Sequence, residues 1–252
     1  MSSLDGSTLA SQGDASKGRP PSKSLLDLPN QKFRCILADP PWDFDDKGSR
    51  VHPSHKGCAA RYQTMTNATI RGLGVGELAT DDAMLWLWTT WSHLLDGSAT
   101  AVATAWGFTP KQCIPWIKAK DGKSKAAYQD HPAVRALFLA GLRVRIGIGH
   151  YVRPVSEPLL LCVKKAGKVA SSRQLPGLIV APRTKHSAKP PEAYDFIETM
   201  CDGPRLELFA RGPGRPGWST WGDQAEPAQS SEAFSDGSSA RDKHPRAEER
   251  DG

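Results

Sequence analysis

The fold is decided by the stretch Cys35-Ile36-Leu37-Ala38-Asp39-Pro40-Pro41-Trp42. Its first four residues are apolar and predict a short buried strand. Two successive prolines cannot continue the hydrogen-bonded ladder of a sheet, so the chain must leave the sheet at Asp39. The acid is therefore expected at the carboxyl end of a strand, and open α/β sheets bind their ligands at this edge.

The same stretch carries groups that suit a flat ring bearing an amino group. Prolines fix φ and lack an N–H, so the loop is rigid and presents carbonyl oxygens without competing donors. Adenine fits, because its amine can donate one hydrogen to the Asp39 carboxylate and the other to the Pro40 carbonyl while Trp42 stacks on the ring. The alternative is an ordinary Asp-Pro-Pro turn closed by a tryptophan in the core.

Apolar runs and helix-like stretches alternate along the middle of the chain, which predicts an α/β sheet covered by helices. The predicted strands are 34–38, 83–88, 112–118, 158–164, 177–181 and 205–210. The predicted helices are 66–79, 91–105 and 190–201. We expect the first helix to begin at the cap Thr66 and the last to be entered through Pro190 and Pro191.

The two ends of the chain have little apolar content. Residues 1–25 are rich in Ser, Gly, Lys and Pro, and residues 225–252 have Phe234 as their only large apolar side chain. Such segments cannot bury enough surface to offset the entropy of ordering. Both are predicted to be disordered, the second as an acidic tail, and the folded domain is predicted to span residues 26–224.

The charge distribution favours a polyanionic partner. The chain has a formal net charge of +6, the first 30 residues are neutral, and residues 223–252 contain eight acidic and four basic side chains. The part between these ends therefore carries +10. A surplus of that size suits nucleic acid, although basic surfaces also serve solubility.

The cysteines and histidines give no sign of disulfides or of a metal. The five cysteines are far apart, odd in number and without a Cys-x-x-Cys pair, which favours a reduced, cytoplasmic protein. His52-Pro-Ser-His55 lies near Cys58, but no second pair of ligands with zinc spacing follows, so no metal is predicted. No segment reaches the apolar length of a membrane span, and the N-terminus lacks a signal-peptide core.

A second group of candidate residues lies near the end of the domain. Arg205–Gly214 is typical of a strand running into a glycine-containing turn, which lets a nucleotide-like ligand approach the backbone. His186–Pro191 follows a strand and opens a helix, which places Lys189 where it could pair with a ligand carboxylate. Trp221–Gln224 adds polar groups suited to ribose hydroxyls. Taken singly, these features have ordinary explanations as a turn and a solvated lysine.

Two long polar stretches, residues 43–62 and 119–150, fit neither the strand nor the helix pattern. Long loops inside a compact domain are usually lids or binding loops. Because the second is rich in lysine and arginine, we expect it to contact the backbone of a nucleic acid.

Taken in order along the chain, these motifs resemble the DPPW family of S-adenosylmethionine-dependent N6-adenine methyltransferases, the Ime4-type enzymes whose best-known members methylate adenosine in messenger RNA. The resemblance covers roughly residues 33–224. It rests on Ala38–Trp42, Arg61–Met65, Met84–Trp88, Ile114–Lys118, Gly149–Glu157, His186–Pro190, Glu207–Arg211 and Trp221–Gln224. It implies a Rossmann-like sheet with helices on both faces, permuted so that the base-binding strand comes first and the cofactor strand last.

On the substrate side, the resemblance implies that Asp39 and the Pro40 carbonyl hold the target amine. The catalytic residues that it implies are Asp39, Pro40, Pro41 and Trp42. The substrate-binding residues that it implies are Tyr62, Trp116, Lys118 and Glu157. Tyr62 and Trp116 would join Trp42 around the adenine.

On the cofactor side, the resemblance implies S-adenosylmethionine. The cofactor-binding residues that it implies are Asp39, Ser187, Lys189, Phe209, Arg211, Asp223 and Gln224. Lys189 would pair with the methionine carboxylate, with Ser187 close by. Phe209 and Arg211 would lie by the adenosine moiety, and the last two residues would reach its ribose or base.

The chain departs from the messenger-RNA enzymes at two places. Asp223 stands where they have an asparagine, and the stretch Gly212–Gly217 differs from theirs in length and residues. Both departures affect the expected ribose contacts.

Several functions remain open at the level of sequence. Compact size without accessory domains favours a bacterial or phage enzyme acting on DNA, and the alternative is the same reaction on RNA. Another alternative is an inactive member that binds nucleic acid, although such members typically lose the residues at Asp39 or Lys189, which are present here. A third is a methyltransferase acting on small amines. The recognition sequence, the preferred strandedness and the choice between monomer and homodimer stay open.

Overall fold

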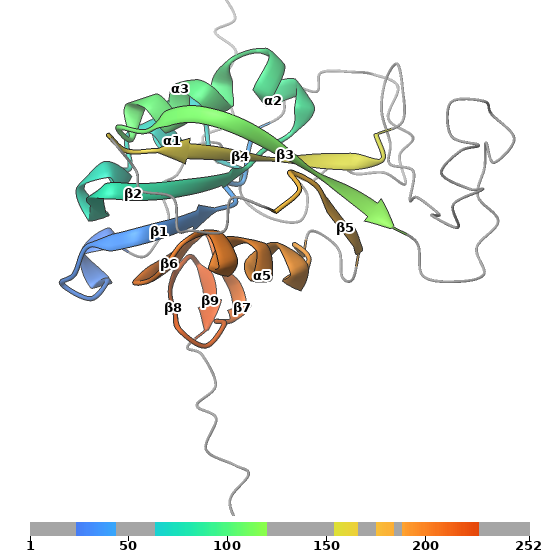
Figure 1. Cartoon of the computed structure of the whole chain (residues 1–252). Helices are drawn as coiled ribbons and strands as arrows, with labels where there is room; N and C mark the ends of the chain where they lie inside the picture. The colour runs from blue at the N-terminus through green and yellow to red at the C-terminus, as the bar shows by residue number, and fades with distance from the viewer. Residues whose placement is uncertain (1–23, 44–63, 120–153, 166–174, 184–187, 227–252) are drawn as a thin grey trace, which may run out of the picture.

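The computed structural model of the chain describes residues 24–43, 64–119, 154–165, 175–183 and 188–226 (Figure 1). Seven strands form one mixed sheet in the order β5-β3-β4-β2-β1-β6-β8. They are β1 (Phe33–Ala38), β2 (Ala79–Trp88), β3 (Thr109–Ala119), β4 (Ser156–Val163), β5 (Ile179–Pro182), β6 (Arg205–Leu208) and β8 (Trp218–Trp221). A separate parallel pair joins β7 (Arg211–Pro213) to β9 (Gln224–Glu226).

The strands β1 to β6 confirm the six predicted strands, with shifted ends. The sixth stops at Leu208 rather than at residue 210, because Phe209 adopts a left-handed backbone conformation with φ 62° that cannot continue a strand. The sequence analysis missed β7, β8 and β9. These strands have three or four residues each and lie among glycines and prolines, so no apolar run marks them.

The helices are shorter than predicted, and two of the three predictions are split. The α-helices are α1 (Asn67–Arg71), α2 (Trp91–Leu95), α3 (Ser98–Ala105) and α5 (Pro191–Met200), and 3-10 helices cover Leu25–Asp27 and Val75–Leu78. The single helices predicted at 66–79 and 91–105 are wrong, because Gly74 (φ 67°) and Gly97 (φ 82°) interrupt them.

The predicted helix starts are confirmed. The Thr66 hydroxyl accepts a hydrogen bond from the Thr69 N–H at 3.2 Å, as an N-cap does. Pro191 is the first residue of α5, with Pro190 as the preceding cap residue, so the missing proline N–H leaves no helical bond unmade.

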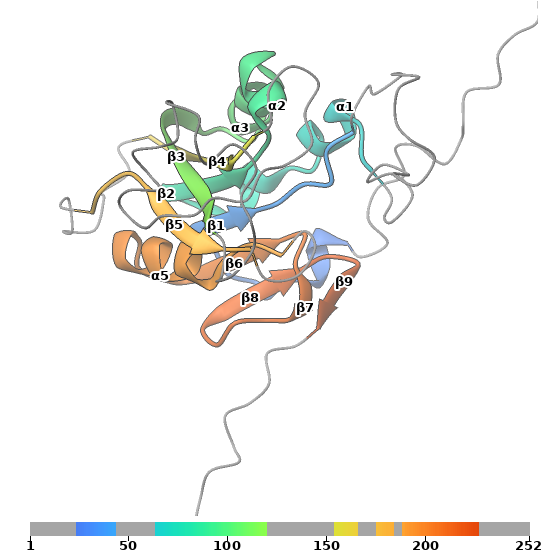
Figure 2. The same ribbon diagram turned by 90° about the vertical axis from the view of Figure 1, so that its right-hand side faces the viewer.

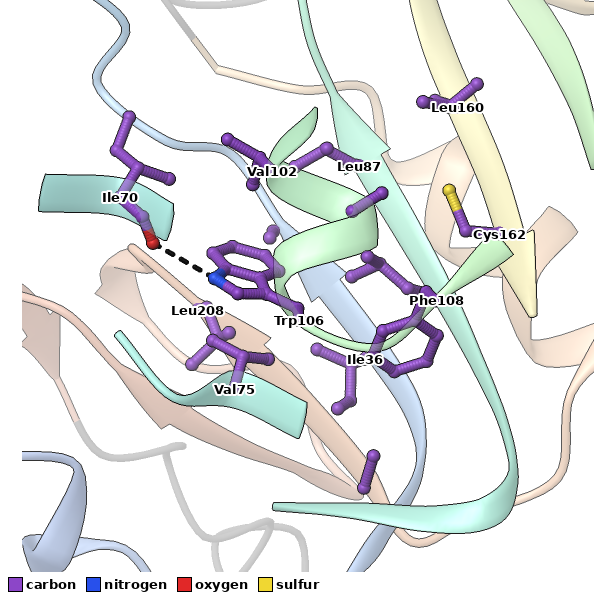
Figure 3. Close-up of a cluster of buried hydrophobic side chains, with 14 of the residues drawn as sticks. Ile36, Ile70, Val75, Leu87, Val102, Trp106, Phe108, Leu160, Cys162 and Leu208 are labelled. Atoms are coloured by element: carbon purple, nitrogen blue, oxygen red, sulfur yellow. Dashed lines mark hydrogen bonds between the residues drawn. The ribbon is translucent and has the colours of Figure 1, made fainter. Parts of the chain in front are cut away.

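Helices cover both faces of the sheet (Figures 1 and 2). On one face, α1 and α3 pack around Trp106, whose Nε1 donates to the Ile70 carbonyl at 3.0 Å above Ile36 and Leu87 (Figure 3). On the opposite face, α5 buries Ala193 and Ile197. The alternation of strand side chains between these two apolar clusters confirms the predicted α/β, Rossmann-like architecture.

One strand of the sheet runs against the others. β1 pairs in parallel with β2 and β6, and β3 pairs in parallel with β5. β4 is antiparallel to both of its neighbours, β2 and β3. In Figure 1 the arrowheads of β1 and β3 point to the same side, and that of β4 points away from it. The start of β4 therefore lies at the edge where β1, β2, β3, β5 and β6 end.

Several predictions fall on residues outside the described ranges. These include nearly all of the two terminal segments and of the loops 43–62 and 119–150, which stay predictions. Before β1, the Ser24 carbonyl accepts a hydrogen bond from Trp221 Nε1 at 3.1 Å, and the predicted bounds of the domain stay a prediction. Among the described residues, no helix is long and apolar enough to cross a membrane.

Candidate active site

The sheet brings charged residues from five strands to one edge. Asp39 follows β1, Lys118 is near the end of β3, Lys189 comes between β5 and α5, and Arg211 follows β6. Glu157 reaches the same edge because it is the second residue of the antiparallel strand β4, where it lies opposite Trp116. These five charged residues, which we call the edge cluster, are far apart in the sequence and adjacent in space.

The edge cluster alternates positive and negative charges. Lys189 Nζ lies 2.9 Å from Asp39 Oδ1 and 3.4 Å from Glu157 Oε1. Arg211 Nη2 lies 3.3 Å from Asp39 Oδ2, and Lys118 Nζ lies 3.1 Å from Glu157 Oε2. Each carboxylate is thus held between two cations. The Lys189 side chain is only 11% exposed, so its contacts are made largely out of water.

The protonation states of the cluster follow from these contacts. Burial alone would raise the pKa of Glu157, but the charges of Lys189 and Lys118 outweigh it and hold that pKa below its usual value. Burial alone would lower the pKa of Lys189, but Asp39 and Glu157 outweigh it and raise that pKa. At neutral pH both side chains are therefore charged.

The loop after β1 is rigid, as its prolines predict, but its carbonyls are not free of donors. The Pro40 carbonyl accepts the Trp42 N–H at 2.9 Å, and the Pro41 carbonyl accepts the Met65 N–H at 2.8 Å. The expectation of acceptors without competing donors is therefore wrong. A carbonyl oxygen has two lone pairs, so the Pro40 oxygen can still accept one further hydrogen bond.

Trp42 lies in the core and not at the surface. Its side chain is 5% exposed, and its ring stacks on His93 with the ring centroids 5.0 Å apart. Its Nε1 donates to the Trp88 carbonyl at 3.0 Å. The Trp42 ring is therefore largely covered, as the alternative of a core tryptophan expects, and its stacking on adenine stays a prediction. Because His93 lies far along the chain, the sequence around Trp42 gave no sign of this.

Trp116 is also buried, with 1% of its surface exposed. Its Nε1 donates to the Ala181 carbonyl at 2.9 Å, and its ring meets Trp88 edge to face. Lys118 Nζ lies 5.3 Å from the Trp116 ring centroid, and Lys189 Nζ lies 5.2 Å from that of Trp88. The two indoles therefore contact the lysines of the edge cluster through attraction between cation and ring face, and the expected contact of Trp116 with adenine stays a prediction.

A pocket of about 240 Å³ opens beside the edge cluster, between α5 and the end of β6. Its lining is Lys189, Pro191, Tyr194, Glu207, Ala210, Arg211, Pro213 and Arg215. Tyr194 donates its hydroxyl to Glu207 Oε1 at 2.8 Å. Burial and the Asp39 charge raise the pKa of Glu207 despite this hydrogen bond. The pocket thus combines cations, an acid and a phenol within reach of Asp39.

The backbone on one side of this pocket is closely packed. Phe209 has a positive φ, and its ring meets Trp221 edge to face with the centroids 5.4 Å apart. The Ala210 N–H donates to the Trp221 carbonyl at 2.9 Å. A Cβ at Gly222 would lie 2.6 Å from the Ala210 carbonyl oxygen, so only glycine fits there. This contact joins the end of β6 to the segment that leads into β9.

The remaining predicted residues have different outcomes. Asp223 and Gln224 are exposed, and Gln224 pairs in register with Arg211 in the β7–β9 ladder, so they lie next to the edge cluster. Tyr62 and Ser187 lie outside the described residues. Their roles, and those of the other predicted site residues, stay predictions.

Sequence reasoning missed three of the side chains around this site. Tyr194 and Glu207 line the pocket, and His93 stacks on Trp42 and donates from Nε2 to the Asp43 carbonyl at 3.0 Å. Glu207 carried a signal, because it is a charged residue in a strand whose neighbours Leu206 and Leu208 are fully buried. Among the described residues, no group of His, Cys, Asp and Glu is arranged to hold a metal ion.

The profile of the MT-A70 family matches residues 33–138 and 139–224, which is most of the chain. The chain belongs to the MT-A70 family. The family resemblance predicted from the sequence is thereby confirmed, and with it the class of methyltransferase.

Individual relatives cover the chain to different extents. Over 224 residues the chain is 25% identical to the Type II methyltransferase M.MunI of Mycoplasma sp, a match covering 82% of this chain and 83% of that protein. Over 197 residues it is 28% identical to the human N(6)-adenosine-methyltransferase catalytic subunit METTL3, covering 77% of this chain and 28% of that protein. A Drosophila melanogaster MT-A70-like protein matches in the same way. The chain thus spans most of M.MunI and little more than a quarter of METTL3.

MT-A70 methyltransferases depend on S-adenosylmethionine, so the predicted cofactor is confirmed. The residues present fit it. Lys189 is a largely buried cation able to face a carboxylate, and the pocket beside it offers Glu207 and Tyr194 as polar partners. Lys189 also contacts Asp39, so the pocket adjoins the loop after β1 directly.

Proposed function

We propose that this protein transfers the methyl group of S-adenosylmethionine to N6 of adenine in nucleic acid, and that its substrate is a defined sequence in DNA. The observation that carries the proposal is the position of the Asp39 carboxylate, 2.9 Å from Lys189 and 3.3 Å from Arg211. The acid that would hold the amine contacts two residues that would hold the cofactor. Placing two reactants side by side is the main requirement of a direct transfer.

The target amine would be held by the Asp39 carboxylate and the Pro40 carbonyl. A carboxylate has about four lone-pair positions, of which Lys189 and Arg211 use one on each oxygen. The Pro40 oxygen keeps one position after accepting the Trp42 N–H. When both N6 hydrogens are accepted, the nitrogen becomes more pyramidal, and its lone pair is less delocalised into the ring. Holding the amine in this way makes a poor nucleophile a better one.

The cofactor side would use the pocket between α5 and β6. When bound, S-adenosylmethionine supplies a methyl group on a positively charged sulfur. Lys189 would pair with its carboxylate, with Ser187 nearby. Phe209 and Arg211 would lie by the adenosine moiety. Gln224, the first residue of β9, and Asp223, which precedes it, would reach the ribose or the base of the cofactor's adenosine moiety.

Charge balance would be kept by the substrate-side pair Glu157 and Lys118. Because the pKa of Glu157 is held below its usual value, this carboxylate stays negatively charged. It would balance the positive charge of Lys189 while Asp39 binds the amine. The proton on N6 becomes acidic once the methyl group has moved, so Asp39 need not be a strong base. Tyr62 stays in the proposal as an adenine contact, whereas the buried rings of Trp42 and Trp116 act by supporting the loop and the lysines.

The likeness to the Type II methyltransferase M.MunI, which extends over 83% of that protein, is the ground for placing DNA ahead of RNA. A base within a duplex would have to be flipped out of the stack, at a cost of a few kcal/mol. Contacts to phosphates would supply part of the binding energy, so affinity should fall steeply as the salt concentration rises.

The test is incubation of the protein with labelled S-adenosylmethionine and matched DNA and RNA pools. We expect label in DNA at a small set of sequences and much less label in RNA. A preference for RNA would overturn the choice of polymer and leave the chemistry standing. If the protein binds the cofactor but methylates neither polymer, two alternatives would be favoured. The protein would be an inactive family member that binds nucleic acid, or a methyltransferase that acts on small amines.

A further inference from the structure

Trp91 is unlike the other tryptophans of this chain. The chain has eight tryptophans, and seven are buried with at most 6% of their surface exposed, whereas Trp91 is 37% exposed. Large aromatic side chains are usually highly buried, because water contact with the ring is unfavourable. An exposed indole beside a candidate active site therefore calls for a functional explanation.

Trp91 is held in place at the edge of the sheet that carries the active site. It is the first residue of α2, directly after the cap Thr90 and three residues after the end of β2. Its Nε1 donates to the Ser156 hydroxyl at 3.1 Å. Ser156 begins β4 and immediately precedes Glu157, so the indole is anchored at the same edge of the sheet as the edge cluster. This hydrogen bond orients the ring before any ligand arrives.

Trp91 also supplies an exposed aromatic face, which the other described side chains of the site do not. Binding of an unpaired base needs an aromatic face, and the rings expected to provide one, Trp42 and Trp116, are buried. Of the large apolar side chains exposed among the described residues, Trp91 alone is aromatic. The series of contacts leads from Trp91 to Ser156, then through Glu157 and Lys189 to Asp39. Because several residues separate the ring from Asp39 in this series, we assign it to a base next to the target and not to the adenine held at Asp39.

We propose that Trp91 is a stacking platform for the nucleobase that flanks the target adenine on the same strand. The inference rests on the proposed function, because only a nucleic acid substrate brings such a base to this edge. Stacking accepts any base, since every base has an aromatic face, so Trp91 contributes to affinity and to strand position and not to sequence choice. The +10 surplus on the central part of the chain favours this polyanion over a protein partner at the same surface.

The experiment uses the full chain and a DNA duplex containing a site already shown to be methylated by the wild-type protein. 2-Aminopurine replaces the base on either side of the target adenine, because its fluorescence is quenched by stacking. The variants are Trp91→Ala, Trp91→Phe and, as a matched control, Leu95→Ala, which removes an 84% exposed apolar side chain from the same helix.

For Trp91→Ala we expect Kd and KM for DNA to rise about tenfold with kcat changed less than about threefold, the loss expected for one stacked base. Quenching of the flanking 2-aminopurine should disappear, whereas S-adenosylmethionine affinity and Tm should stay as in wild type. Trp91→Phe should recover most of the affinity and the quenching. Leu95→Ala should behave as wild type.

Three different outcomes would overturn the inference. If wild type methylates DNA and Trp91→Ala leaves KM, Kd and quenching unchanged, the stacking role is wrong and the proposed function stands. If wild type methylates no nucleic acid, the proposed function itself is wrong, and no nucleobase is left for Trp91 to bind. A change in oligomeric state for Trp91→Ala with unchanged DNA affinity would assign the surface to a second copy of the chain and also count against stacking.

Discussion

The two edges of the sheet use ion pairs in different ways. At the amino edge, the pairs Arg34–Asp82 (2.8 Å) and Lys165–Asp81 (3.1 Å) each join two side chains that are at least 31% exposed. At the carboxyl edge, five charged residues from different strands form one alternating series, and none is more than 32% exposed. The chemistry of the side chains is similar, but their surroundings are not.

This difference supports the proposal that the ligands bind at the carboxyl edge. An exposed pair gains little from its attraction, because water and salt screen it. A largely buried series costs more to desolvate, and removing one member leaves its neighbours uncompensated. A charged ligand that exchanges with one member can restore the compensation, which supports the proposal that the transfer reaction takes place at the carboxyl edge. Each prediction below changes one side of this comparison.

The largest effect is expected for Asp39→Ala. Removing the acceptor of the target amine should lower the rate of methyl transfer by about 10³-fold or more, by analogy with loss of a hydrogen-bonding group that acts in the transition state. The affinity for S-adenosylmethionine should weaken only moderately, because Lys189 keeps Glu157 as a partner. Single-turnover kinetics measure the rate of methyl transfer, and calorimetric titration measures the affinity for S-adenosylmethionine. Full activity in this variant would remove the basis of the assignment.

The next effect is expected for Lys189→Met. This substitution leaves Asp39 and Glu157 without the cation between them and should remove the partner of the cofactor carboxylate. We expect the Kd for S-adenosylmethionine to rise by about 10²-fold, equivalent to about 3 kcal/mol, the lower end of the loss for one member of a buried pair. Calorimetry measures this directly. An unchanged Kd would show that the carboxylate is bound elsewhere.

The pH dependence of stability should be dominated by the carboxyl edge. The pKa of Glu157 is lowered in the folded state, so its contribution is present above the unfolded value of about 4.3 and is lost as the pH falls through the folded pKa. The pKa of Lys189 is raised, so its contribution is present below about pH 10 and is lost as the pH rises through the folded pKa. Urea unfolding of wild type and Glu157→Gln should therefore converge as the pH falls below about 4. A constant difference across that range would contradict this.

The smallest effect is expected for Asp82→Asn at the amino edge. Its pair with Arg34 is partly exposed, so the free energy of unfolding should fall by no more than about 1 kcal/mol. Methyl transfer and cofactor affinity should match wild type. Chemical denaturation measures the free energy of unfolding, and the transfer assay measures the activity. If Asp82→Asn weakened S-adenosylmethionine binding as much as Lys189→Met does, the proposed difference between the two edges would be wrong.

Local sequence signals predicted much of this structure. The apolar run before Asp39 and the two prolines after it placed β1 and its exit, and Thr66 and Pro191 marked helix starts. Each of these signals acts within a few residues. The resemblance between motifs then brought Lys189 and Arg211 to the same site as Asp39, which the geometry supports.

Features that depend on distant residues could not be predicted in this way. The burial of Trp42 involves stacking with His93. The resemblance implied that Glu157 and Lys118 share the substrate side, but their direct contact depends on the antiparallel direction of β4. Neither the stacking nor the strand direction can be predicted from the sequence next to the residues that it affects. The break at Gly97 was readable in principle, because a glycine inside a helical pattern is a possible stop.

The identity of the methylated nucleoside tests the central claim most directly. DNA treated with the wild-type protein and S-adenosylmethionine would be digested and its nucleosides separated by mass spectrometry, with Asp39→Ala treated in parallel. The account predicts N6-methyladenine as the product of wild type and none from the variant. Methylated cytosine, or N6-methyladenine made equally well without Asp39, would contradict it.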